Sequence, residues 1–231
     1  MATVQMSLFF LIYRYIFGGA IHAAGIPYVD FLVPGFIATG VLFSGIGAAV
    51  ATAEDVQSGV IDRLRSLPIP RSSVLVARAI ADTAILTLAS IVTVAIAFAV
   101  GFRLHGSVAN GLAAFGLVVV FGFAFEWVFV ALGLFAGNGQ AAQGMGMIVF
   151  PFTFISSAYV PVDSLPGWLQ PFAKYQPITE MVDAVRALTL GPQAQALLGH
   201  APSYYVTRAL LWTAVILAAS APLAVARYRR G

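Results

Sequence analysis

Only a few side chains in this sequence have the type and position to do chemistry. Glu126 is the one charged residue in the apolar stretch 104–162, and an ionised carboxylate facing lipid costs about 3 kcal/mol. It therefore either lines a translocation pathway or proton relay, or is a structural carboxylate that is neutral or paired inside a bundle. Arg14 is its obvious partner, although a long arginine can also extend to an interface. The aromatic residues near Glu126, including Phe125 and Phe129, either pack between helices or line an apolar path.

The residues of common enzyme sites are not arranged for catalysis. Lys174, the single lysine, follows an alanine and not the Gly-rich loop that cradles ATP phosphates. His22, His105 and His200 fall in separate loops without metal-ligand spacing, and Ser44 lacks the glycine pattern of a hydrolase elbow. The sequence therefore predicts no catalytic residue, no metal and no cofactor on this chain.

The composition indicates that most of the chain lies in lipid and not in water. Of 231 residues, 60% are apolar and 9% are charged, and the mean hydropathy is +0.93, whereas soluble domains carry about 25% charged residues. The net charge of +3 comes from arginines at the ends of apolar runs, which is typical of membrane anchors and not of a nucleic-acid surface. We predict an all-α polytopic membrane protein, with residues 1–231 forming a single transmembrane domain in a lipid bilayer.

Six apolar runs are long enough to cross a hydrocarbon core, which takes about 20 residues. The predicted transmembrane spans are residues 3–20, 31–53, 79–100, 108–135, 141–160 and 205–226. The glycine and amide residues at 137–140 favour a turn that separates the fourth span from the fifth.

The distribution of basic residues predicts the orientation, because cytoplasmic loops are enriched in Lys and Arg. Seven would lie on one side: Arg63, Arg65, Arg71, Arg78, Arg227, Arg229 and Arg230. Four would lie on the other: Arg103, Lys174, Arg186 and Arg208. This places both termini and the loop 54–78 in the cytoplasm, and the segment 161–203 outside.

The cytoplasmic loop contains a predicted amphipathic helix between the second and third spans. Its apolar positions recur on one helical face: Val56, Val60, Leu64 and Leu67. Its acidic residues are near the start and its basic residues near the end, as the helix dipole favours. Arg78 and Asp82, spaced i,i+4 in the next helix, are predicted to pair.

The external segment 161–203 is too polar to span and too apolar for a free loop. Prolines punctuate it, and the region from Ile178 to Leu188 has one apolar helical face. We predict short helices that lie in, or dip into, the outer leaflet, with Glu180, Asp183 and Arg186 on the surface.

Two stretches resemble one known family. The run Glu54–Pro68, EDVQSGVIDRLRSLP, resembles the first cytoplasmic loop of type-2 ABC exporter permeases of the daunorubicin-resistance branch. The second stretch runs from FPFTFISSAYVP at 150–161, through LPGWL at 165–169 and QPIT at 176–179, to RAL at 186–188. A proline-containing fifth span followed by external helices is the order found in that family.

The resemblance implies a bacterial plasma (inner) membrane subunit that pairs with a separate ABC ATPase, two permeases and two ATPases making one exporter. ATP and Mg²⁺ would bind the ATPase. The loop helix would be the coupling helix that docks on it, and residues 161–203 would be re-entrant helices at the outer end. The implied coupling residues are Glu54, Asp55, Gly59, Arg63, Leu64, Arg65 and Leu67, and the candidate translocation path comprises Glu126, Arg14, Phe125 and Phe129.

The expected function is ATP-driven export of a hydrophobic or amphipathic compound, such as a drug, polyketide or lipid. The alternative is an energy-independent channel or a proton-coupled carrier that uses Glu126. A carrier usually has several intramembrane ionisable residues and an internal repeat. A third alternative is a structural membrane subunit.

Overall fold

The computed structural model describes residues 12, 15, 26–65 and 70–230, and every regular element in them is a helix. Four helices have 29 or 30 residues, and each contains a stretch long and apolar enough to cross a membrane. They are α2 (Tyr28–Gln57), α4 (Arg71–Ala99), α5 (Val108–Ala136) and α11 (Pro202–Arg230). The predicted all-helical fold is confirmed, and four of the predicted spans coincide with these helices.

The other two predicted spans have different outcomes. The first, 3–20, lies outside the described residues except for Ile12 and Tyr15. The fifth, 141–160, is divided into α6 (Gly139–Gly146) and α7 (Val149–Phe154). The break has a local cause, because Pro151 has no N–H to donate to the carbonyl of Met147, which instead accepts from Phe150 N at 3.1 Å.

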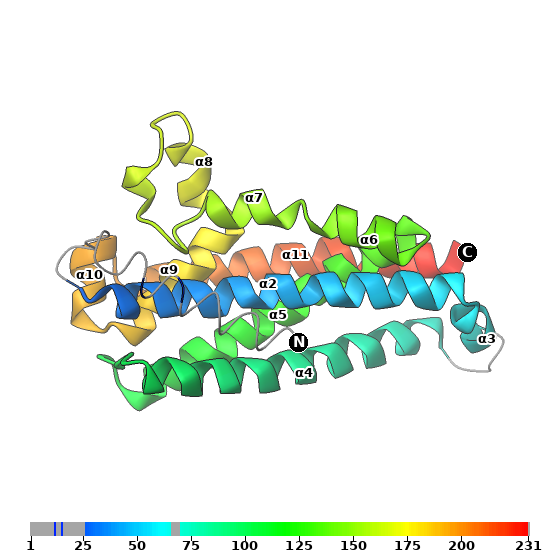
Figure 1. Ribbon diagram of the computed structural model, residues 1–231, viewed down its shortest axis with the longest axis horizontal. Coiled ribbons are helices and arrows are strands. Elements are labelled where there is room, and N and C mark those ends of the chain that lie inside the picture. The colour runs from blue at the N-terminus through cyan, green and yellow to red at the C-terminus, as the bar shows by residue number, and fades with distance from the viewer. Residues whose placement is uncertain (1–11, 13–14, 16–25, 66–69, 231) are drawn as a thin grey trace.

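Figure 1 shows the long helices running side by side, with α6 and α7 continuing one another along α2. At one end of the bundle, here named the α3 end, lie α3 (Val60–Arg65), the start of α4 and the end of α11. At the other, the α9 end, lie α8 (Gln170–Tyr175), α9 (Pro177–Thr189) and α10 (Pro192–Leu198). Together with the 3₁₀ turn η1 (Val162–Ser164), these are the short helices that the sequence predicts in segment 161–203.

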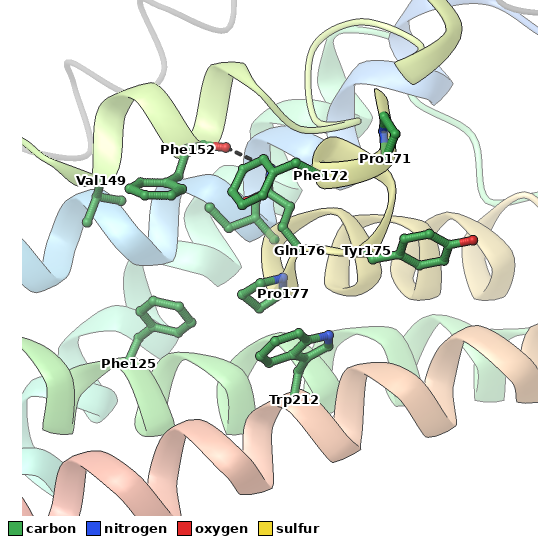
Figure 2. A pocket seen from close by; sticks show the side chains of 10 residues that line it. Phe125, Val149, Phe152, Pro171, Phe172, Tyr175, Gln176, Pro177 and Trp212 are labelled. Carbon is green, nitrogen blue, oxygen red and sulfur yellow. Dashed lines mark hydrogen bonds between the residues drawn. The ribbon is translucent and has the colours of Figure 1, made fainter. Parts of the chain in front are cut away.

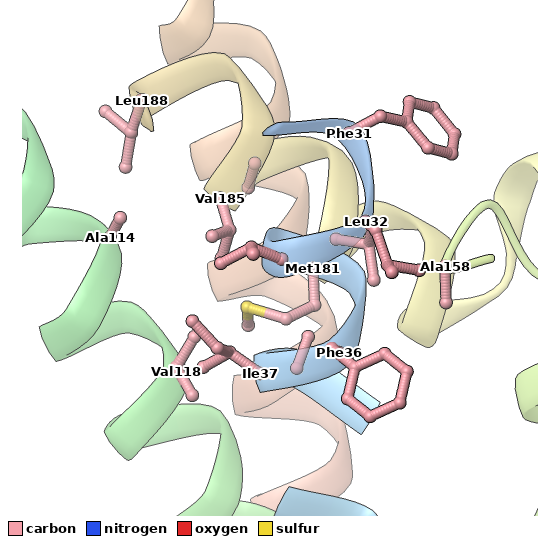
Figure 3. Close-up of a cluster of buried hydrophobic side chains, with 14 of the residues drawn as sticks. Phe31, Leu32, Phe36, Ile37, Ala114, Val118, Ala158, Met181, Val185 and Leu188 are labelled. Carbon is pink, nitrogen blue, oxygen red and sulfur yellow. The ribbon is translucent and has the colours of Figure 1, made fainter. Parts of the chain in front are cut away.

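The helix α5 is the centre of the bundle, in contact with α2, α4, α9 and α11. The largest apolar cluster joins α2, α5 and α9, with Leu32, Val118 and Met181 almost completely buried (Figure 3). In contrast, α4 leaves a row of large apolar side chains exposed, Ile80, Ile85 and Leu88 among them. The exposed face of α4 is the kind of surface that lipid or another apolar helix covers.

Glycines bring α2 and α5 into close contact. A Cβ atom added at Gly45 of α2 would lie 2.0 Å from the ring of Phe129 on α5. A Cβ atom added at Gly133 of α5 would lie 2.4 Å from the carbonyl oxygen of Ala49 on α2. Small residues at helix interfaces allow this approach of the two backbones.

The predicted loop helix 54–67 is not a single helix. Residues up to Gln57 continue α2, Ser58 caps it, and Gly59 turns the chain with φ +73° before α3 begins at Val60. Gly59 has the left-handed conformation that side chains disfavour, and glycines in this conformation commonly end helices. The prediction of one continuous amphipathic helix was therefore wrong.

Candidate functional site

The predicted coupling residues lie at the α3 end of the bundle. Glu54, in the last turn of α2, and Arg63, in α3, are exposed, and Leu64 is half-buried. Arg65 ends α3, but its side chain lies outside the described part of the chain, as does all of Leu67. The described members form an accessible surface with both charge signs.

The inner face of α3 is not the one that the apolar pattern predicts. Ile61 is only 6% exposed and packs with residues of α4, α5 and α11, whereas Val60 is 39% exposed. The break at Gly59 changes the phase between α2 and α3, so the periodicity that starts at Val56 does not continue through Val60.

Arg78 of α4 pairs with acidic residues of two helices at the α3 end. Its guanidinium forms an ion pair with Asp55 in the last turn of α2. Its Nε lies 3.5 Å from Oδ2 of Asp82, which confirms the predicted i,i+4 pair. One arginine thus joins the end of α2 to α4.

Glu126 is buried in α5, with 2% exposure. Its Oε2 has no hydrogen-bond partner among the described residues. The charges of Asp82 and Arg78 act on its carboxyl group. Asp55, Arg78, Asp82 and Glu126 are here named the charge cluster, of which Glu126 is the least exposed member. The partner expected from the sequence, Arg14, lies outside the described residues.

The two candidate aromatic residues near Glu126 have different surroundings. Phe129 is fully buried against Gly45 and the alanines around Ala49. Phe125 lines a cavity, together with residues of α7, α8, α9 and α11. Of the pair, only Phe125 is placed to meet a bound molecule.

This cavity, named here the aromatic cavity, has a volume of about 530 Å³. It is lined by Phe125, Val149, Phe152, Pro171, Phe172, Tyr175, Gln176, Pro177, Ile178 and Trp212. Figure 2 shows the rings of Phe152, Phe172, Phe125 and Trp212 around the space, with Pro177 between them. Its walls suit an apolar molecule with aromatic rings.

A second cavity, of about 450 Å³, lies between α2, α4, α5 and α9. Its lining includes Pro34, Phe98, Phe115 and Val185, and only Thr189 contributes a polar side chain. This surface can accept apolar chains but has little with which to orient a ligand.

The sequence failed to identify a buried charged group on α9. Arg186 is 1% exposed, and its guanidinium donates to the carbonyl oxygens of Phe31, at 3.0 and 3.1 Å, and Ala158, at 3.1 Å. Oδ1 of Asp183 accepts from Arg186 at 3.3 Å and from Ser157 Oγ at 2.8 Å. The prediction that Arg186 lies on the surface was wrong, and Asp183 is half-buried. Their i,i+3 spacing was the available signal of a pair.

Burial shifts the proton affinities of this pair toward the neutral forms. It lowers the pKa of Arg186 to about 10, against the opposing effect of Asp183. Burial likewise raises the pKa of the Asp183 carboxyl, and the Arg186 charge and the Ser157 hydrogen bond counteract it. Since an arginine with a pKa of about 10 remains protonated at neutral pH, the guanidinium keeps all its donors for α2 and the α7–η1 connection.

Glu180 is a further buried acid on α9 that was predicted on the surface. It is 3% exposed, and its Oε1 lies 2.6 Å from Arg208 of α11. Burial raises the pKa of the Glu180 carboxyl, and the Arg208 charge opposes that effect. One ion pair therefore joins α9 to α11, whereas the pair of Arg186 and Asp183 lies within α9.

Comparisons with known proteins identify the family. The family profile "ABC-2 type transporter" matches residues 1–190. The chain is 30% identical over 223 residues to the daunorubicin resistance ABC transporter permease protein of Streptomyces coeruleorubidus, covering 96% of this chain and 76% of that protein. It is 26% identical over 236 residues to the "Probable doxorubicin resistance ABC transporter permease protein" of Mycobacterium tuberculosis strain H37Rv, covering 99% and 80%.

These matches confirm the resemblance carried by the run Glu54–Pro68 and residues 150–188. In such a transporter the ATPase is a separate subunit, so this chain is a transport subunit and not itself an enzyme. The apolar helices place it in a membrane, which it crosses several times. The chain belongs to the ABC-2 type transporter family, as a permease subunit that works with a partner ABC ATPase.

Proposed function

We propose that this chain exports a hydrophobic or amphipathic compound, such as a drug, polyketide or lipid, across a bacterial plasma membrane. Two permease subunits, identical or related, would assemble with two ATPases that bind ATP and Mg²⁺. The observation that carries the proposal is the family match, because the two relatives are named as permease proteins for resistance to daunorubicin and to doxorubicin. The two apolar cavities agree with such a cargo.

In the proposed topology residues 1–231 form one permease domain with six spans. The first span is 3–20, and α6 with α7 makes the fifth as a broken helix. The α3 end carries Arg63, Arg78 and Arg227, and the positive-inside tendency favours the cytoplasm for it. Both termini would then be cytoplasmic and α8–α10 external.

Coupling to the ATPase would start at the α3 end. The exposed residues Glu54, Arg63 and the half-buried Leu64 offer charges at a rim and an apolar anchor, the usual division of roles in an interface. Gly59, Arg65 and Leu67 complete the proposed contact. ATP binding would move α3, and the ion pairs of Arg78 would carry the movement into α2 and α4.

The test is a double variant of the coupling segment, Gly59→Trp with Leu64→Asp. The tryptophan is strained at φ +73°, and the aspartate removes the apolar anchor. We expect loss of drug-stimulated ATPase activity in the purified complex, with normal amounts of permease in the membrane.

Gly101→Trp is the matched control for this variant. Gly101 also has a positive φ, +109°, and also has nothing within 4 Å of an added Cβ atom, but it lies beyond the other end of α4. Full coupling in the double variant would disprove the coupling assignment.

The second candidate is a proton-coupled carrier, which one observation favours: Glu126 is buried with an oxygen that has no hydrogen-bond partner in the described part of the chain. Vesicles that contain the complex distinguish the two mechanisms. Transport that needs ATP and persists when a protonophore collapses the gradient supports the exporter. Transport driven by the gradient without ATP supports the carrier.

A further inference from the structure

We propose that the aromatic cavity is a subsite for the exported compound. It selects apolar molecules that carry an O–H or N–H group, and this group donates a hydrogen bond to the side-chain oxygen of Gln176. The inference deepens the proposed export function and rests on it. Neither the family match nor the relatives' names assign this cavity or this residue a role.

The orientation of the Gln176 amide follows from its partners. Nε2 lies 3.0 Å from the carbonyl oxygen of Phe152 and 2.5 Å from that of Ile155. Carbonyls only accept hydrogen bonds, so the NH₂ group must face them and the amide oxygen must point elsewhere. These carbonyls lie in and just after the last turn of α7. The carbonyl oxygens at the end of a helix have no N–H partner within the helix, so they can accept hydrogen bonds from a side chain.

The amide oxygen is left as an acceptor. Gln176 lines the cavity and is only 4% exposed. Its Oε1 has no hydrogen-bond donor among the described residues. A buried acceptor without a partner is costly, and a donor supplied by a bound molecule removes that cost. Figure 2 shows the Tyr175 hydroxyl directed away from the cavity, so it does not compete for this role.

The rest of the cavity determines the shape of the molecule. The Phe152 and Phe172 rings lie 6.0 Å apart between centroids on one side, and Phe125 and Trp212 line the other. Flat aromatic molecules pack well between such rings. The volume of about 530 Å³ is in the range of sites for drug-sized ligands, which favours the exported compound over a lipid headgroup as the source of the donor.

The test uses two fluorescent probes that differ in the donor alone. 1-Pyrenemethanol has a hydroxyl group, and 1-(methoxymethyl)pyrene is its ether without one. The permease–ATPase complex is placed in nanodiscs of phosphatidylcholine, whose headgroup has no N–H or O–H donor. Energy transfer from Trp212 to pyrene is measured with Trp127→Phe and Trp168→Phe, which leave Trp212 as the only tryptophan of the permease.

We expect the hydroxyl probe to bind this protein about 3- to 10-fold more tightly than the ether, the range for one hydrogen bond. Gln176→Lys keeps donors for the two carbonyls but removes the acceptor, and should abolish the preference. Gln170→Lys is the matched control, because the Gln170 amide also donates to two carbonyls, those of Asp163 and Leu165, but does not line the cavity. It should keep the preference.

If the protein that keeps Gln176 binds the two probes with equal affinity, the proposal is overturned, whatever the variants do. Displacement of the hydroxyl probe when phosphatidylethanolamine, which has ammonium donors, replaces phosphatidylcholine would assign the site to lipid and also overturn it. ATP-dependent daunorubicin uptake by inside-out vesicles is measured in parallel. Uptake without a probe preference refutes the subsite alone, whereas no ATP-dependent uptake refutes the proposed function.

Discussion

Arg78 on α4 and Asp55 in the last turn of α2 form an ion pair at the α3 end of the bundle. The two side chains are 22% and 37% exposed, so water screens the pair only partly. Asp82, on the same helix as Arg78, also pairs with the Arg78 guanidinium. A displacement of the α2 end relative to α4 must therefore stretch or break the contact between Arg78 and Asp55. The pair is therefore a direct connection between the end of α2 and α4.

A double-mutant cycle measures this connection. Arg78→Gln and Asp55→Asn should each reduce drug-stimulated ATPase activity several-fold, since each removes the ion pair between α2 and α4. The double variant should be no worse than either single one, with a coupling energy of about 1 kcal/mol. Asp163→Asn, at an exposed acid of η1, is the control, and additive effects of the two changes would contradict a direct link.

The α2–α5 contact predicts opposite effects of two glycine substitutions on the same helix. Gly45→Ala drives a methyl group into the Phe129 ring and should destabilise the protein by about 1–3 kcal/mol. Gly47→Ala meets nothing within 4 Å and should be neutral or stabilise α2. Thermal unfolding in detergent measures both, and Phe129→Ala should lessen the effect of Gly45→Ala; equal melting temperatures for the two variants would disprove the close contact.

Removal of the buried guanidinium on α9 should be among the most harmful single changes. Arg186→Met leaves the Asp183 carboxylate buried without its cation and should cost about 3–5 kcal/mol. Arg186→Lys keeps the charge but cannot fork to two carbonyls, so it should recover only part of the stability. Thermal unfolding of Arg103→Gln, at an exposed arginine of the α4–α5 connection, supplies the comparison. A near-normal melting temperature for Arg186→Met would refute the role given to this side chain.

Glu126→Gln tests whether the buried carboxyl acts in transport. Gln has nearly the same shape, so the protein should unfold at about the same temperature. We expect ATP-driven export to fall several-fold, because the variant removes the only acid of the charge cluster that α5 contributes. Steady-state uptake by inside-out vesicles measures this, and normal export of every substrate tried would end the pathway role of Glu126.

Local patterns in the sequence predicted the long helices well. Apolar runs bounded by prolines and polar turns coincide with α2, α4, α5 and α11, and Gly137 and Asn138 separate α5 from α6 as expected. The i,i+4 pair of Arg78 and Asp82 was equally local. Each of these depends on residues within about one helical turn of each other, so a single sequence contains the needed information.

The failures have causes that act over longer distances or on one dihedral angle. The burial of Arg186 requires carbonyl groups from Phe31 and Ala158, which no spacing near residue 186 reveals. The helix break at Gly59 depends on the backbone choosing a positive φ, which a glycine permits but does not require. The aromatic cavity likewise gathers residues from α5, α7, α8, α9 and α11, so only the packed structure could reveal it.

The contact of Arg186 with Phe31 also constrains the order of events during biosynthesis. The two residues are 155 positions apart, so a ribosome that adds roughly 5–20 residues per second needs about 8 to 30 s to make the second after the first. During this interval the carbonyl oxygen of Phe31 has no guanidinium partner, because Arg186 has not been made. The α9 end of the bundle must therefore close after translation has passed residue 186, and a nascent chain stalled before that point should expose this end of α2 to proteases and chaperones.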